Sequence, residues 1–431
     1  MQHSLTTAVP VGAYRMKYLR FALLAAVSAF SVARAQESDE QRQRPPTEIP
    51  DFSNLDEYIY EPKSSVRLGF RSLGGVTASF SGTGSIQTPE DFNQDLTRTD
   101  ITRSYHDGTV SPDARTTARL DDYGNPMIDP HTGNTISDPI APDGKTNTWN
   151  YSDSRQVDSD HTAPGYIAFH SYSAEVTDQA VRSQKSRTTN GLDLMVARDM
   201  GKLLKGRVSW NLIGGISVND ISARKIDTVA GTIQEIADHY SLFGRNPPDA
   251  PYEAPSSSTT TSGTSGTSVT VDSSVLISQI PLFRQIRDVA AGSGDSMIIR
   301  NNWKVKGAYY TFRGGAEVWI PITSRLRLNL TLAAAIIYSG TNYTVIQSLT
   351  PEIGSDIIET DTSDAYKLLP GYYADASLQF DLTEKTGFFA GVIYQSAGSY
   401  TQTIDSDTAH YSTKVDFKNL NGMRAGMSVR F

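Results

Sequence analysis

Apolar and polar residues alternate along the last stretch of the chain, residues 415–431. Counting back by twos from the final residue gives a mostly apolar set, whereas the positions between are small or charged. A period of two places such sets on opposite faces of a β-strand. We therefore predict a terminal strand whose apolar face carries Phe431, Val429, Met427, Ala425, Phe417 and Val415.

The same alternation recurs in seven earlier segments, near residues 66–80, 192–197, 208–218, 308–320, 326–338, 372–382 and 388–394. The first of these contains Gly74-Gly75, which predicts a bend or bulge. Its expected apolar face carries Val66, Leu68, Phe70, Val76, Ala78 and Phe80. Short turns are predicted near Lys202, Ser324 and Lys385. The total is eight strands, with ten or twelve as the alternative.

These segments predict an all-β protein, a transmembrane antiparallel up-and-down barrel. The alternation alone does not distinguish this barrel from a soluble sandwich, because period two does not say which face is inside. Charged residues opposite the apolar face favour the membrane barrel. So do aromatic residues near both strand ends, which predict two interfacial girdles: Tyr310, Tyr338, Tyr372 and Tyr394 towards the loops, and Trp210 and Phe388 towards the turns.

Two long polar stretches separate the early strands, at about 87–188 and 220–302. They are rich in turn-forming residues and are predicted as external loops, because barrels of this type have short turns on one side and long loops on the other. Within the first stretch, Tyr166–Val176 is predicted as a hairpin that stands above the membrane, since counting it as a spanning strand would give an odd total.

The N-terminus predicts export. Lys17 and Arg20 precede an apolar run at 21–30 and the sequence Ala33-Arg34-Ala35, which is the order of a secretory signal peptide. We predict a signal peptide at 1–35, cleaved after Ala35, with residues 1–15 as an upstream extension. Residues 36–63 are predicted as a periplasmic lead-in, and residues 64–431 as the barrel.

Composition excludes several classes of protein. The 431 residues include no cysteine, which removes disulfides, thiol catalysis and thiolate metal sites. The formal net charge of -8 argues against a nucleic-acid partner, which would favour a basic face. No cofactor is predicted.

With its signal peptide, alternating strands and aromatic C-terminus, the chain resembles outer-membrane β-barrel proteins of Gram-negative bacteria, and most of all the small OmpA, OmpX and OmpW barrels with longer loops. The resemblance implies a bacterial outer-membrane location, with the lipid bilayer and lipopolysaccharide as partners. It also implies that the barrel-assembly machinery reads the terminal strand at Phe431, Val429, Met427 and Ala425.

The face opposite the apolar one collects charged residues. The interior of an eight-stranded barrel is just wide enough to be filled by side chains, so opposite charges there predict a paired plug. A gated or selective pore is the alternative, and it gains weight if the barrel has ten or twelve strands. The predicted lumen network is Arg67, Arg71, Arg207, Arg313, Glu317, Arg327, Asp375, Asp381 and Arg424.

Two kinds of chemistry are conceivable in the loops. Asp238-His239, Asp121-Asp122 and His410 could converge as a water-activating rim, as general base catalysis would require. Oxygen ligands between Asp121 and Asp129 could accept calcium, although the spacing of a complete calcium loop is missing. The leading prediction is a non-enzymatic barrel that displays loops for interaction or envelope integrity. A passive solute pore is second, and a barrel hydrolase third.

Overall fold

The computed structural model describes residues 63–89, 95–157, 165–204, 208–262, 267–292 and 297–431. The predicted signal peptide and nearly all of the lead-in lie outside these residues. Two compact units divide the chain, Met1–Glu61 and Pro62–Phe431, and the fold below is that of the second. None of its described helices has the length and apolar character needed to cross a membrane.

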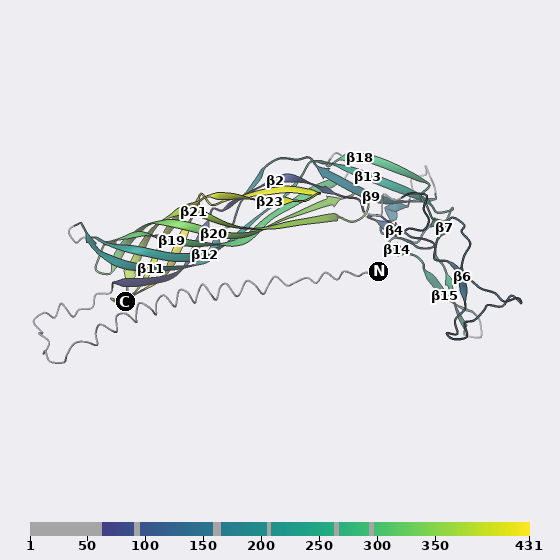
Figure 1. The fold of residues 1–431 in the computed structure, drawn as a ribbon, viewed down its shortest axis with the longest axis horizontal. Coiled ribbons are helices and arrows are strands. Elements are labelled where there is room, and N and C mark those ends of the chain that lie inside the picture. The colour runs from purple at the N-terminus through teal and green to yellow at the C-terminus, as the bar shows by residue number, and fades with distance from the viewer. Residues whose placement is uncertain (1–62, 90–94, 158–164, 205–207, 263–266, 293–296) are drawn as a thin grey trace, which may run out of the picture. The chain divides into compact units, whose positions relative to one another are not determined.

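Eight antiparallel strands form a closed barrel (Figure 1). In barrel order they are β1 (Ser64–Gly74), β11 (Thr189–Leu203), β12 (Val208–Thr228), β19 (Ile298–Pro321), β20 (Leu326–Thr350), β21 (Ile357–Asp381), β22 (Thr386–Ala397) and β25 (Leu420–Arg430). The barrel closes between β25 and β1, where Val429 lies opposite Val66. The all-β antiparallel barrel predicted from the alternation is therefore confirmed. Each alternating segment supplies one strand, although parts of the first and last segments lie outside the barrel.

A second sheet continues part of the barrel wall (Figure 1). Its order is β18 (Phe283–Ala290), β13 (Gly231–Ser241), β9 (Tyr166–Val176), β2 (Thr77–Ile86), β24 (Ala409–Asp416) and β23 (Ser399–Asp405), with β10 (Arg182–Lys185) paired to β2. Three of its strands are continuous in sequence with barrel strands. Strand β2 follows β1 after two residues, β23 follows β22 after one, and β24 precedes β25 by three. The segment Tyr166–Val176 belongs to this sheet, where it pairs with β13, and not to the barrel.

The remaining strands are short. One sheet contains β3 (Arg103–Ser104), β4 (Gly108–Val110), β8 (Trp149–Tyr151) and β14 (Tyr252–Glu253). A 3-10 turn at Ser154–Gln156 follows β8 in the chain. Three further pairs are β5 (Thr116–Ala118) with β6 (Ser137–Pro139), β7 (Lys145–Thr146) with β17 (Ile277–Ser278), and β15 (Ser257–Ser262) with β16 (Thr267–Asp272). The two stretches predicted as external loops thus contain most of the second sheet and these small sheets.

The alternation shifts by one residue where β1 passes into β2. Odd-numbered side chains such as Arg67 point inwards in β1, whereas Ala78 and Phe80 are buried in β2. Between them Gly75 has φ +113°, and a Cβ there would lie 2.0 Å from the carbonyl oxygen of Asn419. An irregular residue of this kind moves every later side chain to the opposite face.

The same shift occurs between β24 and β25, and between β22 and β23 at Gly398. The outward face predicted for five apolar residues near these bends is therefore wrong. All five are buried: Val76, Ala78, Phe80, Val415 and Phe417.

Strands β12, β19, β20 and β21 run on without such a shift, and in β19 and β20 the chemistry of the two faces inverts instead. In β20, Leu330, Leu332 and Ile336 face outwards, and Asn329 and Thr331 face inwards. Further along the same strand, inward positions carry apolar residues such as Val345, while outward positions are mostly polar. The strand therefore passes from a region with an apolar outside to one with an apolar inside.

The inverted region has an apolar core of its own. Phe80 of the second sheet stacks on Trp303 of β19 and Tyr343 of β20, with ring centroids 6.2 and 6.1 Å apart. All three side chains are buried, so the second sheet packs on the extended barrel strands. A further cluster around Trp149 and Phe169 lies beneath the small sheets.

Candidate functional site in the barrel lumen and beyond it

The lumen holds an ion pair that spans it. The guanidinium of Arg67 on β1 donates to both carboxylate oxygens of Glu317 on β19, at 2.5 and 2.7 Å. Strands β1 and β19 are not neighbours in the barrel, so the pair crosses the interior. Glu317 also accepts the indole N–H of Trp319 at 2.6 Å. A buried carboxylate with several charge-assisted hydrogen bonds is held in one position.

A second network links four strands. Asp193 on β11 accepts from Arg313 at 2.6 Å and lies 3.3 Å from Arg424. Arg424 on β25 in turn donates to Asp375 on β21 at 2.5 and 2.7 Å. The acids and bases alternate, so each buried charge has an opposite charge beside it, although Nε and Nη1 of Arg313 have no hydrogen-bond partner among the described residues.

The remaining predicted lumen residues lie at the two ends of these networks. Asp381 pairs with Arg327 at 3.2 Å and with Arg430, near the turn end of the barrel. Arg71 donates to Ser217 Oγ at 2.5 Å and to the Gln395 amide oxygen at 3.3 Å instead of meeting a carboxylate. Arg207 lies outside the described residues.

Sequence reasoning missed the aromatic part of the lumen. The ring of Trp319 lies 4.1 Å from the Arg327 guanidinium carbon, and the ring of Tyr373 lies 4.5 Å from that of Arg313. Aromatic faces attract such cations. Trp319 has the same odd-numbered parity as Arg313 and Glu317, and that parity was the signal that could have placed it inside.

The described charged side chains of the lumen are almost entirely removed from solvent. A water column would keep lumen side chains wet, yet Arg67, Arg71, Asp193 and Glu317 are at most 1% exposed, and Asp375 is 6% exposed. Beyond them, the interior continues into the apolar core around Phe80. The arrangement is that of a filled lumen, as expected for eight strands.

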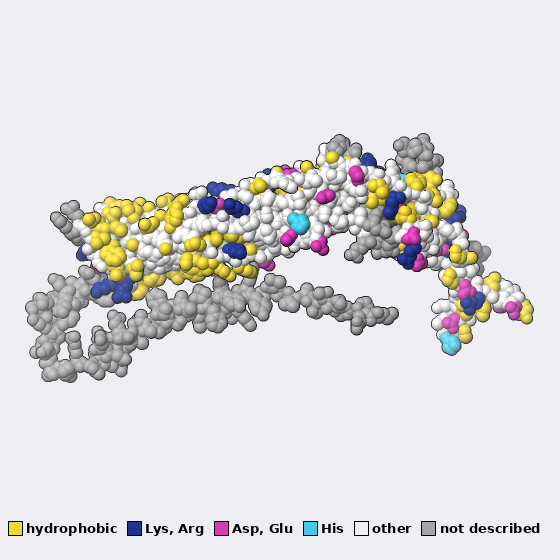
Figure 2. All heavy atoms as spheres, turned by 45° about the horizontal axis from the view of Figure 1, so that its top comes forward, with side chains coloured by type: hydrophobic (Ala, Val, Ile, Leu, Met, Phe, Trp, Pro, Cys, Tyr) yellow, Lys and Arg dark blue, Asp and Glu magenta, His cyan; other side chains and the backbone are white. Residues whose placement is uncertain are grey.

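The outer surface of the barrel is apolar. Phe70 is 72% exposed and Leu332 is 68% exposed, although soluble proteins rarely expose large apolar patches. Figure 2 shows hydrophobic side chains gathered over one part of the barrel surface. An apolar outside with a charged inside is the inverse of a soluble barrel and is the distribution of a transmembrane one.

The predicted girdle and terminal residues lie on this surface. Tyr372 and Tyr394 adjoin, with ring centroids 6.0 Å apart, and Tyr338 stacks on Tyr366 at 6.5 Å. All other predicted members of the two sets are partly or fully exposed on the same face: Tyr310, Trp210, Phe388, Phe431, Val429, Met427 and Ala425.

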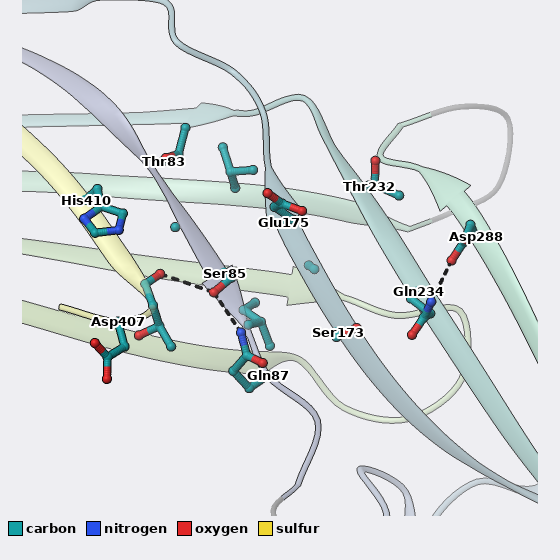
Figure 3. A pocket seen from close by; sticks show the side chains of 15 residues that line it. Thr83, Ser85, Gln87, Ser173, Glu175, Thr232, Gln234, Asp288, Asp407 and His410 are labelled. Atoms are coloured by element: carbon teal, nitrogen blue, oxygen red, sulfur yellow. Dashed lines mark hydrogen bonds between the residues drawn. The ribbon is translucent and has the colours of Figure 1, made fainter. Parts of the chain in front are cut away.

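A polar cavity of about 560 Å³ lies where β2 leaves β24 and begins to pair with β9 (Figure 3). The Ser85 hydroxyl lies within hydrogen-bond distance of the Thr408 carbonyl oxygen and of the Gln87 amide. His410, at its edge, is 2.5 Å from Asp405. The serine and the histidine therefore have separate partners and do not form a nucleophile–base pair.

The predicted hydrolytic rim does not assemble. Asp238 and His239 are consecutive on β13, so their side chains point to opposite faces. Asp238 is buried and paired with Arg284 at 2.7 Å, while the His239 ring lies 4.2 Å from that of Phe283. These pairings hold Asp238 as part of the packed interior.

The other loop candidates form turns. Asp121 accepts the backbone N–H groups of Tyr123 and Asn125, and Asp129 accepts that of His131. Such Asx turns use the carboxylates that calcium would need. Among the described residues, no group of three or more acidic or histidine side chains is arranged to hold a metal ion.

A buried Asp–His pair that the sequence did not indicate lies in the second sheet. His170 Nδ1 is 2.6 Å from Asp107 Oδ2, and its Nε2 is 4.0 Å from Glu235. His170 is only 5% exposed, so a substrate has little access to it. Next to it, burial lowers the pKa of His106 to about 4, and His106 Nδ1 accepts the N–H of Tyr172.

Comparison with known proteins gives little further information. No family model matches the sequence, and no curated protein matches it. Among solved structures, the outer membrane protease OmpT from Escherichia coli matches with 8% identity and a TM-score of 0.25 over 86% of this chain and 97% of that one. A Pseudomonas aeruginosa FadL homologue matches with 9% identity and a TM-score of 0.17, over 86% and 90%. Similarity this low says nothing about the activity of this chain.

Proposed function

We propose that this protein is a closed barrel of a bacterial outer membrane which anchors a large folded β-structure at the cell surface, where it serves interaction or envelope integrity. The observation that carries the proposal is the inversion along β19 and β20. Starting from the short turn that joins the two strands, the outward face is apolar as far as Tyr310 on β19 and Tyr338 on β20. Further from that turn, both outward faces are mostly polar. Such strands suit lipid below the tyrosines and water above them.

The height of the apolar zone supports this assignment. Ten residues separate Leu328 from Tyr338 on β20, which correspond to about 34 Å along a strand and about 25 Å along the barrel axis at the usual tilt. Bacterial barrels carry an apolar band of about this height.

The orientation follows from the two ends of the barrel. Ser64 and Phe431 exchange backbone hydrogen bonds at the end that has the short turns. With a signal peptide cleaved after Ala35, that end would face the periplasm and the second sheet would face outwards. The terminal strand with Phe431 would serve recognition by the assembly machinery.

Planar-bilayer recording tests the closed barrel. Purified protein should insert without discrete channel openings, with a general porin as the positive control in the same lipid. Reproducible single-channel steps from this protein would favour the passive pore instead. Fractionation and heat-modifiable gel mobility test the location, and the mature protein should begin at Gln36. Recovery in the soluble fraction without a mobility shift would refute the membrane assignment.

A further inference from the structure

Another cavity, of about 460 Å³, lies at one end of the small sheet that contains β4, β8 and β14. Strand β4 begins at Gly108, β8 ends at Tyr151 and β14 begins at Tyr252, and the register sets Tyr151 opposite both of the others. The three strand ends therefore line one hollow, to which the segment between β20 and β21 adds Ser355. We call it the sheet-end cavity. Its volume is in the range of small-molecule sites, about 300–1,000 Å³.

Two tyrosine rings form the aromatic part of this lining. Tyr151 and Tyr252 are cross-strand neighbours whose ring centroids lie 6.2 Å apart, and Tyr252 also packs against Trp149 at 5.0 Å. The Tyr252 hydroxyl accepts the backbone N–H of Val275. Because this hydroxyl is used within the protein, the partly exposed ring is what Tyr252 presents to a ligand, and its position is fixed in advance.

Three polar groups of the lining keep an atom for a ligand. The Asn150 amide donates to Thr109 Oγ1 at 2.7 Å, and its amide oxygen meets no other described residue. His106 Nδ1 accepts the N–H of Tyr172 at 2.9 Å. Since burial lowers the pKa of His106 to about 4, the ring is neutral near pH 7 and carries its proton on Nε2, as a donor. Glu253 lies opposite Asn150 in the register and is exposed, and its carboxylate forms no hydrogen bond or ion pair within the part of the chain that the structure describes.

This combination of groups matches the chemistry of a pyranose sugar. One face of a pyranose ring consists mostly of C–H groups, which pack on aromatic rings, while its edge carries neighbouring hydroxyls. A carboxylate and a side-chain amide can bind two such hydroxyls. The larger cavity beside Ser85 lacks the aromatic part, because its described lining includes no tyrosine, tryptophan or phenylalanine. The sheet-end cavity offers both kinds of contact.

We propose that the sheet-end cavity binds a pyranose sugar, which stacks on Tyr252 and donates neighbouring hydroxyls to Glu253 and Asn150. The Nε2–H group of His106 donates to a further sugar oxygen. The inference deepens the proposed function and rests on it, because it names a class of ligand for the β-structure that the barrel anchors. Since Tyr252, Asn150 and His106 are already held by their other hydrogen bonds, binding orders few side chains.

Isothermal titration calorimetry of the full-length protein tests the site, in micelles of a detergent without a sugar headgroup. The probes are N-acetylglucosamine and the methyl glycosides of glucose, galactose and mannose. Sorbitol is the control ligand, because it has the hydroxyls of a hexose without a ring face. At least one sugar should bind with a Kd of the order of 1 mM, the affinity expected for about 12 non-hydrogen atoms. Saturation of aromatic protons should transfer to the C–H protons of that sugar.

Two variants locate the binding. Glu253→Gln should weaken it about 10-fold, because the charged acceptor is lost, and Ser355→Trp should abolish it by filling the cavity from an exposed position. The matched control is Glu175→Gln, which changes an exposed carboxylate in the larger cavity and should bind like wild type. An equal loss in the control, equal binding of sorbitol, or binding of none of the sugars would overturn the proposal.

A polymer of the sugar that binds distinguishes the source of the ligand. Tighter binding of the polymer than of the single sugar would support a surface glycan as the ligand, and equal or weaker binding would support a free sugar. Failure of the proposed function is a separate result. Recovery in the soluble fraction without heat-modifiable mobility would refute the membrane barrel, whether or not the protein bound sugar.

Discussion

Arg67 and Glu317 lie 250 positions apart in the chain and meet in the middle of the barrel through two hydrogen bonds of 2.5 and 2.7 Å. Their side chains are 1% and 0% exposed. Neither charge has water as an alternative partner, so each depends on the other.

Glu317→Gln should destabilise the barrel. The substitution leaves the Arg67 guanidinium buried without its opposite charge, which costs about 3–5 kcal/mol of the free energy of unfolding. Urea unfolding in micelles, followed by the gel mobility shift, measures the loss. Glu359→Gln, at an exposed position of β21, is the control. The double variant Arg67→Met with Glu317→Leu should recover most of the stability, and a single variant as stable as wild type would contradict a plug held by this pair.

Gly75→Ala should impair folding at the bend between β1 and β2. Alanine is strained at φ +113°, and its Cβ would lie 2.0 Å from the Asn419 carbonyl oxygen, so we expect a loss of more than about 2 kcal/mol. Gly214→Ala is the matched control, because its Cβ would have no atom within 4 Å. The folded fraction on refolding into micelles compares them. Equal yields would mean that the bend tolerates an ordinary residue.

Phe80→Ala should loosen the second sheet more than the barrel. Phe80 is fully buried against Trp303 and Tyr343, and removing such a ring costs about 3–5 kcal/mol. Hydrogen exchange should therefore accelerate in β2 and β24 and stay slow in β20 near Leu332. Phe70→Ala, on the outward face of the barrel, should leave exchange in β2 and β24 unchanged. The same pattern from both variants would show that the two regions do not have separate cores.

Acid should weaken the region around His106. Its pKa falls from an ordinary 6.5 to about 4 because of burial, so between these values the unfolded chain binds a proton that the folded chain does not. Stability from this group is therefore present above about pH 6.5 and is lost as the pH falls towards about 4.

Limited proteolysis of the second sheet against pH measures this loss. His106→Gln should flatten the dependence, because it removes the titrating group, and His131→Gln should not, since that imidazole is 92% exposed. A profile that keeps its shape in the His106 variant would assign the pH dependence to another group.

The alternation that begins at Phe431 and recurs in seven earlier segments predicted the strands, because period two is a local property that the sequence displays directly. The charged and aromatic positions on those strands then favoured a membrane barrel. Parity also placed Arg313, Glu317 and Arg424 on one inward face. It did not reveal which of them would meet, since Asp193, which joins Arg313 to Arg424, comes from a third strand, β11. Pairing depends on the strand stagger around the closed barrel, which no local pattern contains.

Parity failed at the bends. Gly75 shifts the alternation by one residue, and a local reading that continues across it assigns Phe80 to lipid when it lies in a core. The alternation also did not show how far the long strands extend. Beyond Tyr338 the outward positions of β20 are mostly polar, and such a stretch of sequence resembles a loop. The sequence by itself determined which segments are strands and which faces differ. Only the tertiary structure decided which face is inside beyond the membrane zone, because that depends on what packs against it.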